Sequence, residues 1–360
     1  MENSSNLEHK RKKSYFCTLN QSERQITAMI ENYPNPRRKH CETGTFLNML
    51  DYYGYRDISE PMAFGIGSGI YFLYSPFLRM RGVVLPMLRI KPACIVKNFS
   101  ERMNIGYHGM KYGYRVNKAM RELDELVEQK IPVGVVVTVS GLDYFGKIVN
   151  ESHFNGHVLT VIGKEGSKYV IADSDPRLFT DDYVYVEEDV MRKIRFAQGL
   201  AAPEGRMFYL DPPASGFAET VELKPAIVQG LEESCYRMLR MPLRYYGYTG
   251  LHVFAKNLKR WKAYFSNELR GYILLWFYRL IETAGTGGAG YRYIYSSFLK
   301  EAASVFENEV LDDCAVLMDK DADTWRQFSL DCRRYMKSEN VTLNEMADIL
   351  ETIGQQEKDL

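Results

Sequence analysis

The sequence has no excess of charge of either sign. Its 360 residues include 46 lysines and arginines and 46 aspartates and glutamates, so the formal net charge is zero. A neutral chain creates no overall field that attracts nucleic acid or an anionic membrane. We therefore expect no nucleic-acid partner, and any electrostatic docking has to depend on a local cluster of charges.

Long hydrophobic runs are also missing. The longest lie near 133–139 and 271–278, well below the roughly 20 residues that span a bilayer. No apolar signal segment opens the sequence. We therefore expect neither a membrane span nor a membrane partner.

Paired cysteines are absent as well. The six cysteines stand at positions 17, 41, 94, 235, 314 and 332, with no CxxC pair among them. Such scatter is typical of reduced thiols rather than of a disulfide framework or a zinc site. It favours a cytoplasmic location and cysteines that are not paired with one another.

The chain is long enough for a large core and, on length alone, for two domains. Residues 1–14 are polar and basic, which predicts a flexible arm. Near 201–216 the sequence turns to AAPEG and DPPASG, a Pro/Gly-rich change typical of a domain boundary. We predict an arm (1–14), an α+β domain (15–215) and a mainly helical domain (216–360).

Local periodicity predicts the elements of both domains. Apolar residues recur at helical spacing from Cys41 to a stop at Gly54, whereas FGIGSGIYFLYS, which follows, suits turns better than a helix. A helix is predicted at 115–130, and β-branched runs predict strands at 131–139, 157–162 and 168–173. In the second domain the helical patterns cover 227–240, 251–265, 272–284, 293–306 and 343–353.

Cys41 stands at the N-terminus of the first predicted helix. Unpaired N–H groups and the helix dipole at that end favour a thiolate, which is the nucleophilic form of cysteine. A catalytic thiolate also needs an acid/base partner and a third group that orients this partner. His40 is the adjacent histidine, but we do not expect it to be the base.

His157 and Asp173 are the pair that the predicted hairpin brings together. If the hairpin is symmetric about Glu165, His157 lies directly opposite Asp173 on the same face of the sheet. An aspartate in that place would hold an imidazole. A slip of one residue would put the two side chains on opposite faces.

Each of these residues also has a plainer interpretation. Cys41 could be a small buried hydrophobic residue, His157 a strand end, and Asp173 a turn former. His153 and His157 could suggest zinc, but no third and fourth ligands are evident. We therefore expect no metal site.

The segments KHCETGTFLNMLDYYGY, ISEPMAFGIGSGIYF and SHFNGHVLTVIGKEGSKYVIADSDP, in this order, resemble a known family. It is the family named for the N-terminal domain of the butirosin-biosynthesis acyltransferase BtrH, itself similar to papain-like cysteine peptidases of the bacteriocin-processing type. The resemblance runs from about residue 38 to 210. GTGGAGYRYIYSSFLKEAA, from Gly285, resembles the helical domain that often follows.

This resemblance implies a papain-like domain with Cys41 as nucleophile, His157 as acid/base and Asp173 as orienting carboxylate. The implied reaction moves an acyl group from the phosphopantetheine thioester of an acyl carrier protein to a small amine and forms an amide. The enzyme itself would need no cofactor, since the partner carries the phosphopantetheine. The alternatives are a cysteine peptidase or amidase with the same triad, and a binding protein on a silent scaffold.

One departure from papain-like peptidases concerns the oxyanion. Those enzymes usually have a glutamine about six residues before the nucleophile, where this chain has Asn35. Either the Asn35 amide or backbone N–H groups at Cys41 would then bind the oxyanion. By resemblance, Glu60 and His153 are also expected near the site, without an assigned role.

Two segments of the second domain remain. Arg237, Arg240 and Arg244 open a basic, tyrosine-containing stretch, which is either a docking surface for an acidic carrier protein or a solvated helix face. AGTGGAG at 284–290 lacks the context of a nucleotide loop. It favours a turn between helices, with a helix start facing the phosphopantetheine phosphate as the alternative. A homodimer is left open.

Overall fold

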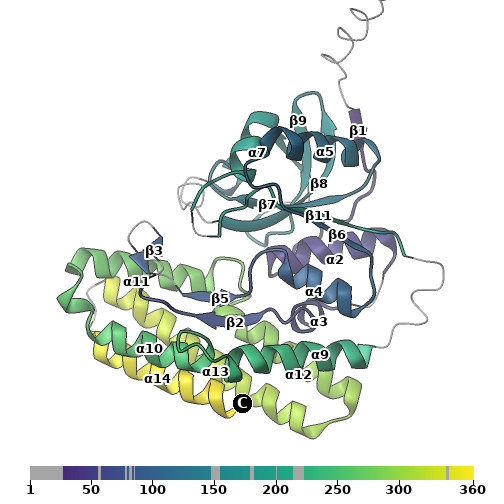
Figure 1. Cartoon of the computed structure of the whole chain (residues 1–360). Helices are drawn as coiled ribbons and strands as arrows, with labels where there is room; N and C mark the ends of the chain where they lie inside the picture. Colours follow the sequence, from purple (N-terminus) through teal and green to yellow (C-terminus); the bar gives the residue numbers. More distant parts are fainter. Residues whose placement is uncertain are drawn as a thin grey trace, which may run out of the picture.

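The computed structural model describes residues 27–55, 58–77, 79–80, 83–84, 86–146, 155–178, 182–199, 201–213, 223–337 and 340–360. The predicted arm at 1–14 and His153 lie outside the described residues. An antiparallel sheet forms the upper part of Figure 1 and a layer of long helices the lower part, with α2, α3 and α4 between them. The expected α+β class, with a sheet domain followed by a helical part, is confirmed.

The main sheet has the strand order β10–β9–β8–β7–β11–β6, and β1 pairs with β8 beyond the end of β7. Its predicted central strands are confirmed as β7, β8 and β9. All pairings in this sheet are antiparallel. Its strands are β1 (Thr27–Met29), β6 (Tyr107–Met110), β7 (Val133–Thr138), β8 (Asn155–Glu165), β9 (Lys168–Ala172), β10 (Val184–Glu187) and β11 (Met207–Leu210).

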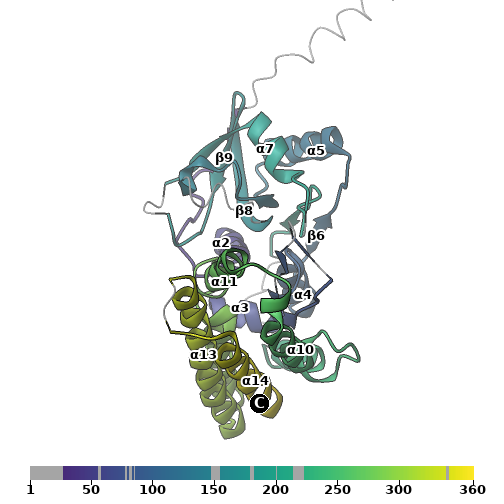
Figure 2. The same ribbon diagram turned by 90° about the vertical axis from the view of Figure 1, so that its left-hand side faces the viewer.

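Helices cover both faces of this sheet. Helices α5 (Val116–Glu128) and α7 (Glu188–Arg195) bury an apolar stripe against the odd-numbered valines of β7. On the other face lie α2 (Cys41–Tyr53) and α4 (Cys94–Arg102), whose core includes Val136 and Val158. The two views in Figures 1 and 2 agree on this layering.

One predicted turn is a helix. Residues Phe64–Ile66 of the FGIGSG segment belong to α3 (Glu60–Ile66), which Ser59 caps through a 3.0 Å bond from the Met62 N–H. The glycines serve close packing: a Cβ on Gly65 would lie 2.0 Å from the Phe298 ring. Tertiary packing against a later helix therefore outweighs the low helix propensity of glycine here.

Two short sheets follow α3. Strands β2 (Ile70–Leu73) and β5 (Met87–Arg89) pair with each other, as do β3 (Arg79–Met80) and β4 (Val83–Val84). Leu73 also forms a bridge to Tyr246. This strand pair therefore connects the first half of the chain with the C-terminal helices.

The helical patterns of the C-terminal part are confirmed. They form α9 (Leu223–Cys235) with its π-helical end η2 (Tyr236–Arg240), α10 (Gly247–Lys259), α11 (Asn267–Glu282), α12 (Arg292–Phe306) and α14 (Leu343–Asp359). The longest helix, α13 (Glu309–Met336), was not predicted. Its buried stripe includes Ala315, Ala322 and Ser329 beside Trp325, so its apolar signal in the sequence is weak. No helix within the described residues is long and apolar enough to cross a membrane.

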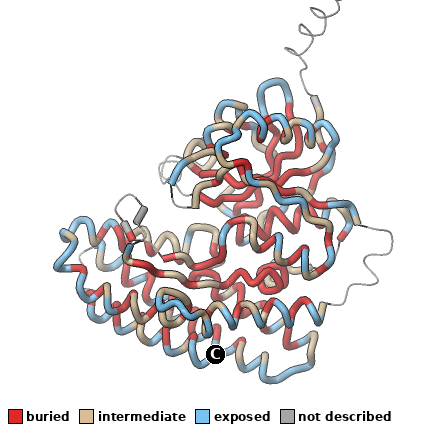
Figure 3. Tube along the Cα trace, viewed as in Figure 1, coloured by how far each residue is buried: buried red, intermediate tan, exposed pale blue. Residues whose placement is uncertain are grey.

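A single hydrophobic core joins α2, α3 and α4 to the C-terminal helices. Tyr74 stacks on Phe254 at 4.4 Å between ring centroids, and Phe72 lies 5.9 Å from Trp325. Figure 3 shows buried residues in the sheet, in the helices beneath it and along the inner sides of the lower helices. The C-terminal helices therefore help to hold the elements that carry Cys41.

The β8–β9 hairpin has a different register from the predicted one. Its first pairs are Glu165↔Lys168 and Gly163↔Val170, and a bulge at Ile162 then changes the pairing to Val161↔Ile171 and Thr160↔Ala172. The predicted symmetric register, with His157 opposite Asp173, is wrong. The bulge is a local irregularity that the alternation of side chains does not reveal.

The bulge nevertheless puts His157 and Asp173 on one face. Without it, continuation of the hairpin register would pair Asp173 with Thr160, on the opposite face from His157. With it, the register continued by one residue beyond the Thr160↔Ala172 pair brings Asp173 opposite Leu159 and diagonal to His157. The two side chains then meet through a diagonal contact rather than a direct cross-strand pair.

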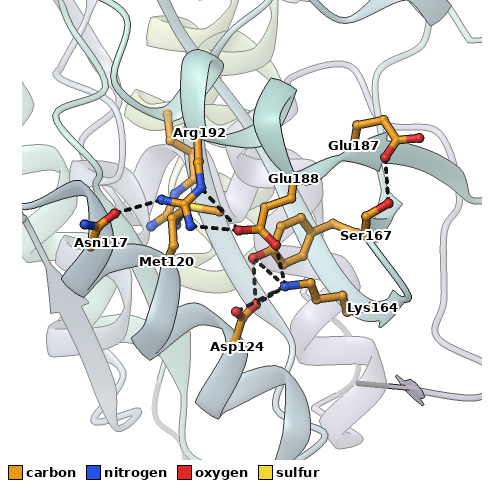
Figure 4. A network of polar contacts seen from close by, with 10 residues as sticks. Asn117, Met120, Asp124, Lys164, Ser167, Glu187, Glu188 and Arg192 are labelled. Atoms are coloured by element: carbon orange, nitrogen blue, oxygen red, sulfur yellow. Dashed lines mark hydrogen bonds and ion pairs between the residues drawn. The ribbon is translucent and has the colours of Figure 1, made fainter. Parts of the chain in front are cut away.

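A buried lysine attaches the β8–β9 hairpin to the helices that cover one face of the sheet. Lys164 Nζ contacts Asp124 at 3.0 Å and Glu188 at 2.9 Å, which links β8 to α5 and α7. Arg192 and Ser167 extend this network to Asn117 and Glu187 (Figure 4). These contacts attach the closed end of the hairpin to α5 and α7.

Candidate active site

Cys41 is the first residue of α2, and a carboxylate from α3 holds the chain just before it. His40, the N-cap residue, makes no side-chain cap bond. Instead Glu60 accepts hydrogen bonds from the backbone N–H of His40 (2.7 Å) and of Lys39 (2.9 Å), and from the Thr43 hydroxyl (3.0 Å). Glu60, expected near the site without a role, thus fixes the helix start that carries the thiol.

The start of α2 is attached to the strands that carry the other two residues. The Thr45 hydroxyl donates to the Val158 carbonyl at 3.1 Å, and the Arg38 N–H donates to the Ser174 carbonyl at 2.8 Å. Arg37 donates to the carbonyl of Asp173. Contacts on either side of His157 and Asp173 therefore bring both residues to the N-terminus of α2.

His157 and Asp173 are bonded in a dry environment. His157 Nε2 lies 2.8 Å from Asp173 Oδ2, and each residue is 1% exposed. The Tyr144 hydroxyl also donates to Asp173 Oδ2 at 2.8 Å, and the backbone N–H of Asp175 donates to Oδ1 at 3.0 Å. Because Nε2 of His157 faces Asp173, Nδ1 is the ring nitrogen that is available to the Cys41 thiol.

The electrostatics favour a charged imidazole. Burial opposes a charge on His157, but Asp173 and Cys41 outweigh it and raise the pKa of His157 well above its usual value, with hydrogen bonds to both side chains among the causes. The arrangement therefore favours a His157 imidazolium between Asp173 and Cys41.

His40 has the opposite environment. Burial, together with the charges of Arg89 and His157, lowers the pKa of His40 well below its usual value. Its Nδ1 lies 3.1 Å from the Thr43 hydroxyl. His40 therefore stays neutral and contacts the first turn of α2.

Two family models match the chain. Residues 40–174 match "Butirosin biosynthesis protein H, N-terminal", and residues 189–360 match "Domain of unknown function (DUF4872)". Over residues 40–174 the chain is thus similar to the N-terminal part of butirosin biosynthesis protein H, and we call these residues the butirosin-H domain. This butirosin-H domain begins at His40 and ends at Ser174, so it contains Cys41, His157 and Asp173. A comparison with curated proteins found no match.

Beside Cys41 the butirosin-H domain holds a buried ion pair that sequence reasoning missed. Glu42 is fully buried and binds Arg89 at 2.7 Å, and it accepts the N–H of Ile95 at 2.9 Å from the start of α4. Arg89 also donates to the Gly156 carbonyl, next to His157, at 3.1 Å. In the sequence, Glu42 is only a charged residue that directly follows Cys41. Its significance depends on the burial of α2 along its first ten residues, which the structure shows.

The remaining predicted residues occupy different places. Asn35 is buried, and its side-chain amide donates to the Asp182 carbonyl at 3.4 Å. Arg237 is paired with Glu233 and donates to the Ser68 carbonyl at 3.1 Å, whereas Arg240 and Arg244 are exposed. His153 lies outside the described residues.

The C-terminal domain also reaches the site of the butirosin-H domain. The link between α11 and α12, predicted as a turn, contains the 3₁₀ turn η4 (Ala289–Tyr291). The Tyr291 ring stacks on Phe64 at 5.4 Å and meets the edge of His40 at 5.2 Å. Sequence reasoning did not identify Tyr291, because nothing local marks a tyrosine that contacts a site some 250 residues earlier.

Proposed function

We propose that this chain is an acyltransferase that forms amides. In this proposal an acyl group passes from the phosphopantetheine thioester of an acyl carrier protein to Cys41 and then to a small amine. The observation that carries the proposal is the contact of His157 with Asp173 beside the Cys41 thiol, within the butirosin-H domain.

In the first half-reaction the Cys41 thiolate attacks the thioester carbonyl. The tetrahedral intermediate collapses by breaking the bond to the pantetheine sulfur, and His157 gives its proton to that sulfur. Exchange of one thioester for another is nearly balanced in energy, so catalysis depends on positioning and on stabilising the oxyanion.

In the second half-reaction the amine attacks the acyl-enzyme. Neutral His157 takes the proton that the amine loses, and the C–S bond breaks to give the amide and the Cys41 thiolate. Asp173 keeps the imidazole in one orientation and stabilises it as a cation during both steps. The enzyme needs no cofactor of its own, because the carrier protein brings the phosphopantetheine.

Water competes with the amine for the acyl-enzyme. If water reacted faster than the amine, the enzyme would be a hydrolase. The low exposure of the site favours transfer: Cys41 is 6% exposed, and the Phe145 ring meets the edge of His157 at 5.3 Å. The alternative is a peptidase or amidase that uses the same residues, and an experiment has to distinguish it from the acyltransferase.

We place the carrier protein on the exposed arginines Arg240 and Arg244. Arg244 lies over the Tyr245 ring, which also contacts Phe77, a side chain that is 77% exposed. Cations beside exposed apolar side chains suit an acidic partner with an apolar patch. Strands β2 and β5 lead from this surface to Arg89 at the site.

Intact-mass spectrometry tests the proposed reaction. The protein is incubated with an acyl-loaded carrier protein, and an amine is added afterwards. We expect a covalent acyl adduct that the amine discharges as amide, and no adduct in Cys41→Ala. Cys94→Ala serves as the matched control, since Cys94 is the other cysteine near Glu42, and should keep the adduct. Discharge by water alone would support the hydrolase, and an undiminished adduct in Cys41→Ala would exclude Cys41 as the nucleophile.

A further inference from the structure

The site lacks the glutamine that commonly binds the oxyanion in papain-like enzymes. Asn35, the residue in its place, directs its amide at the Asp182 carbonyl. The N–H groups of the first turn of α2 remain, since these have no partner within the helix. A further oxyanion donor would have to come from a side chain that another part of the chain brings close to Cys41.

The link between α11 and α12 has an unusual backbone. Five successive residues have positive φ: Gly287 (69°), Gly288 (89°), Ala289 (49°), Gly290 (56°) and Tyr291 (75°). A tyrosine in this region costs free energy that the surrounding structure has to compensate. Such strain is concentrated at functional sites, so the position of the Tyr291 side chain is significant.

Buried contacts hold this strained link in place. Arg292 is fully buried, donates to the Gly290 carbonyl at 2.7 Å and binds Glu357 of α14 at 2.7 Å. Glu282 of α11 accepts the N–H of Ala289 at 3.4 Å. The C-terminal helices therefore maintain the conformation that directs Tyr291 to the site.

Tyr291 is buried against the helix start that carries Cys41. Its side chain is 5% exposed, and its ring forms a cluster with the rings of Phe64 and His40, the residue that precedes Cys41. Gly287 approaches the same segment, since a Cβ there would lie 3.7 Å from Cβ of Lys39. The tyrosine thus lies at the thiol end of α2.

The phenol is protonated and faces charged groups of the site. Burial raises the pKa of Tyr291 to about 12, the charge of Arg89 opposes this rise, and the charge of Cys41 adds to it. Arg89 has only N–H donors, so it can interact with the phenol oxygen but cannot accept the phenol proton, which is left for another acceptor. An oxyanion formed at the carbon bonded to Cys41 would be such an acceptor.

We propose that Tyr291 is a catalytic residue whose hydroxyl donates to the oxyanion of the tetrahedral intermediate at Cys41. It would take the place of the missing glutamine, with Arg89 orienting the phenol. The C-terminal domain would then complete the active site rather than only support it. This inference rests on Cys41 as the nucleophile of the proposed function.

Two reactions of the same thiol test the proposal. Acylation of Cys41 by p-nitrophenyl acetate passes through a tetrahedral oxyanion, whereas alkylation by iodoacetamide does not. Tyr291→Phe keeps the ring contacts and removes the hydroxyl. We expect acylation to become about 100-fold slower, as for loss of one oxyanion donor, while alkylation changes less than about twofold.

Controls separate this inference from the proposed function. The Tyr293 hydroxyl donates to Asp323, and Tyr293→Phe should leave both rates unchanged. Cys41→Ala should leave only the background reaction of the other cysteines, of which Cys235 is exposed. If the wild type reacts at Cys41 but transfers nothing from a carrier protein, the proposed transfer fails while the comparison of Tyr291→Phe still holds. Equal acylation rates in wild type and Tyr291→Phe, or an equal fall of both reactions, would overturn the role of Tyr291.

Discussion

At the residue scale, the site depends on one imidazole held between a carboxylate and a thiol. Burial by itself would make His157 neutral, and Asp173 and Cys41 together reverse this tendency. Tyr144 and the Asp175 N–H hold the carboxylate in turn. Asp173 is therefore the larger of the two influences that keep His157 charged.

The variant Asp173→Asn should lower the pKa of His157, because the negative charge that raises this pKa is lost. His157 then loses its proton at lower pH, so the alkaline limb of the pH–rate profile for transfer should shift to lower pH. We also expect the maximal rate to fall about 100-fold or more, since the orienting carboxylate is gone. The measurement is transfer from an N-acetylcysteamine thioester between pH 5 and 10.

Tyr144→Phe is the matched control for this charge effect. It removes a donor to Asp173 but keeps the carboxylate, so the alkaline limb should not move to lower pH. An alkaline limb that stays in place in Asp173→Asn would show that Asp173 does not determine the charge of His157.

At the element scale, the N-terminus of α2 is capped by a side chain from another helix. His40 supplies no cap, and the three contacts of Glu60 replace it. The sequence signal for a cap is local, usually a Ser, Thr, Asp or Asn at the N-cap itself. A cap supplied from twenty residues away leaves no such signal, so the role of Glu60 was open until the fold was known.

We expect Glu60→Ala to lower the free energy of unfolding by about 1–2 kcal/mol, the usual cost of losing a helix cap. Urea denaturation followed by circular dichroism measures this change. Glu60→Gln, which keeps one acceptor oxygen, should lose less. The exposed Glu101, paired with Lys97 at 3.6 Å, provides the control: Glu101→Ala should change stability by less than about 0.5 kcal/mol. Equal losses in Glu60→Ala and Glu101→Ala would contradict the capping role.

At the scale of the whole molecule, the two parts of the chain share one core and meet at the site. Helix α3 packs with α12, Phe72 of β2 contacts Trp325 of α13, and Tyr291 extends from the C-terminal part to His40. The proposed carrier surface at Arg240 and Arg244 also belongs to the C-terminal part. The C-terminal helices would thus contribute both to chemistry and to partner choice.

Reversing the charge of this surface should weaken carrier binding. In Arg240→Glu/Arg244→Glu we expect KM for an acyl-loaded carrier protein to rise about 10-fold at low salt, because two attractive contacts become repulsive. The effect should shrink as salt screens the charges. Steady-state transfer assays at several salt concentrations measure it.

Two comparisons make this result specific to docking. Transfer from N-acetylcysteamine thioester should be unchanged in the variant, since this donor has no carrier protein. Arg121→Glu/Lys130→Glu, which reverses two exposed cations near α5, should leave KM for the carrier unchanged. An equal rise in both double variants would assign the effect to net charge and not to this surface.

The sequence by itself determined the elements whose signal is local: the helix that begins at Cys41, strands β7 to β9 and most of the C-terminal helices. Their apolar periodicity is the same in the sequence as in the fold. Only the tertiary structure decided the bulge at Ile162, the capping of α2 by Glu60 and the approach of Tyr291, because each depends on packing between distant segments. The structure brings His157 and Asp173 into contact, but through a register other than the predicted one, since a bulge alters the pairing without altering which residues the sequence contains.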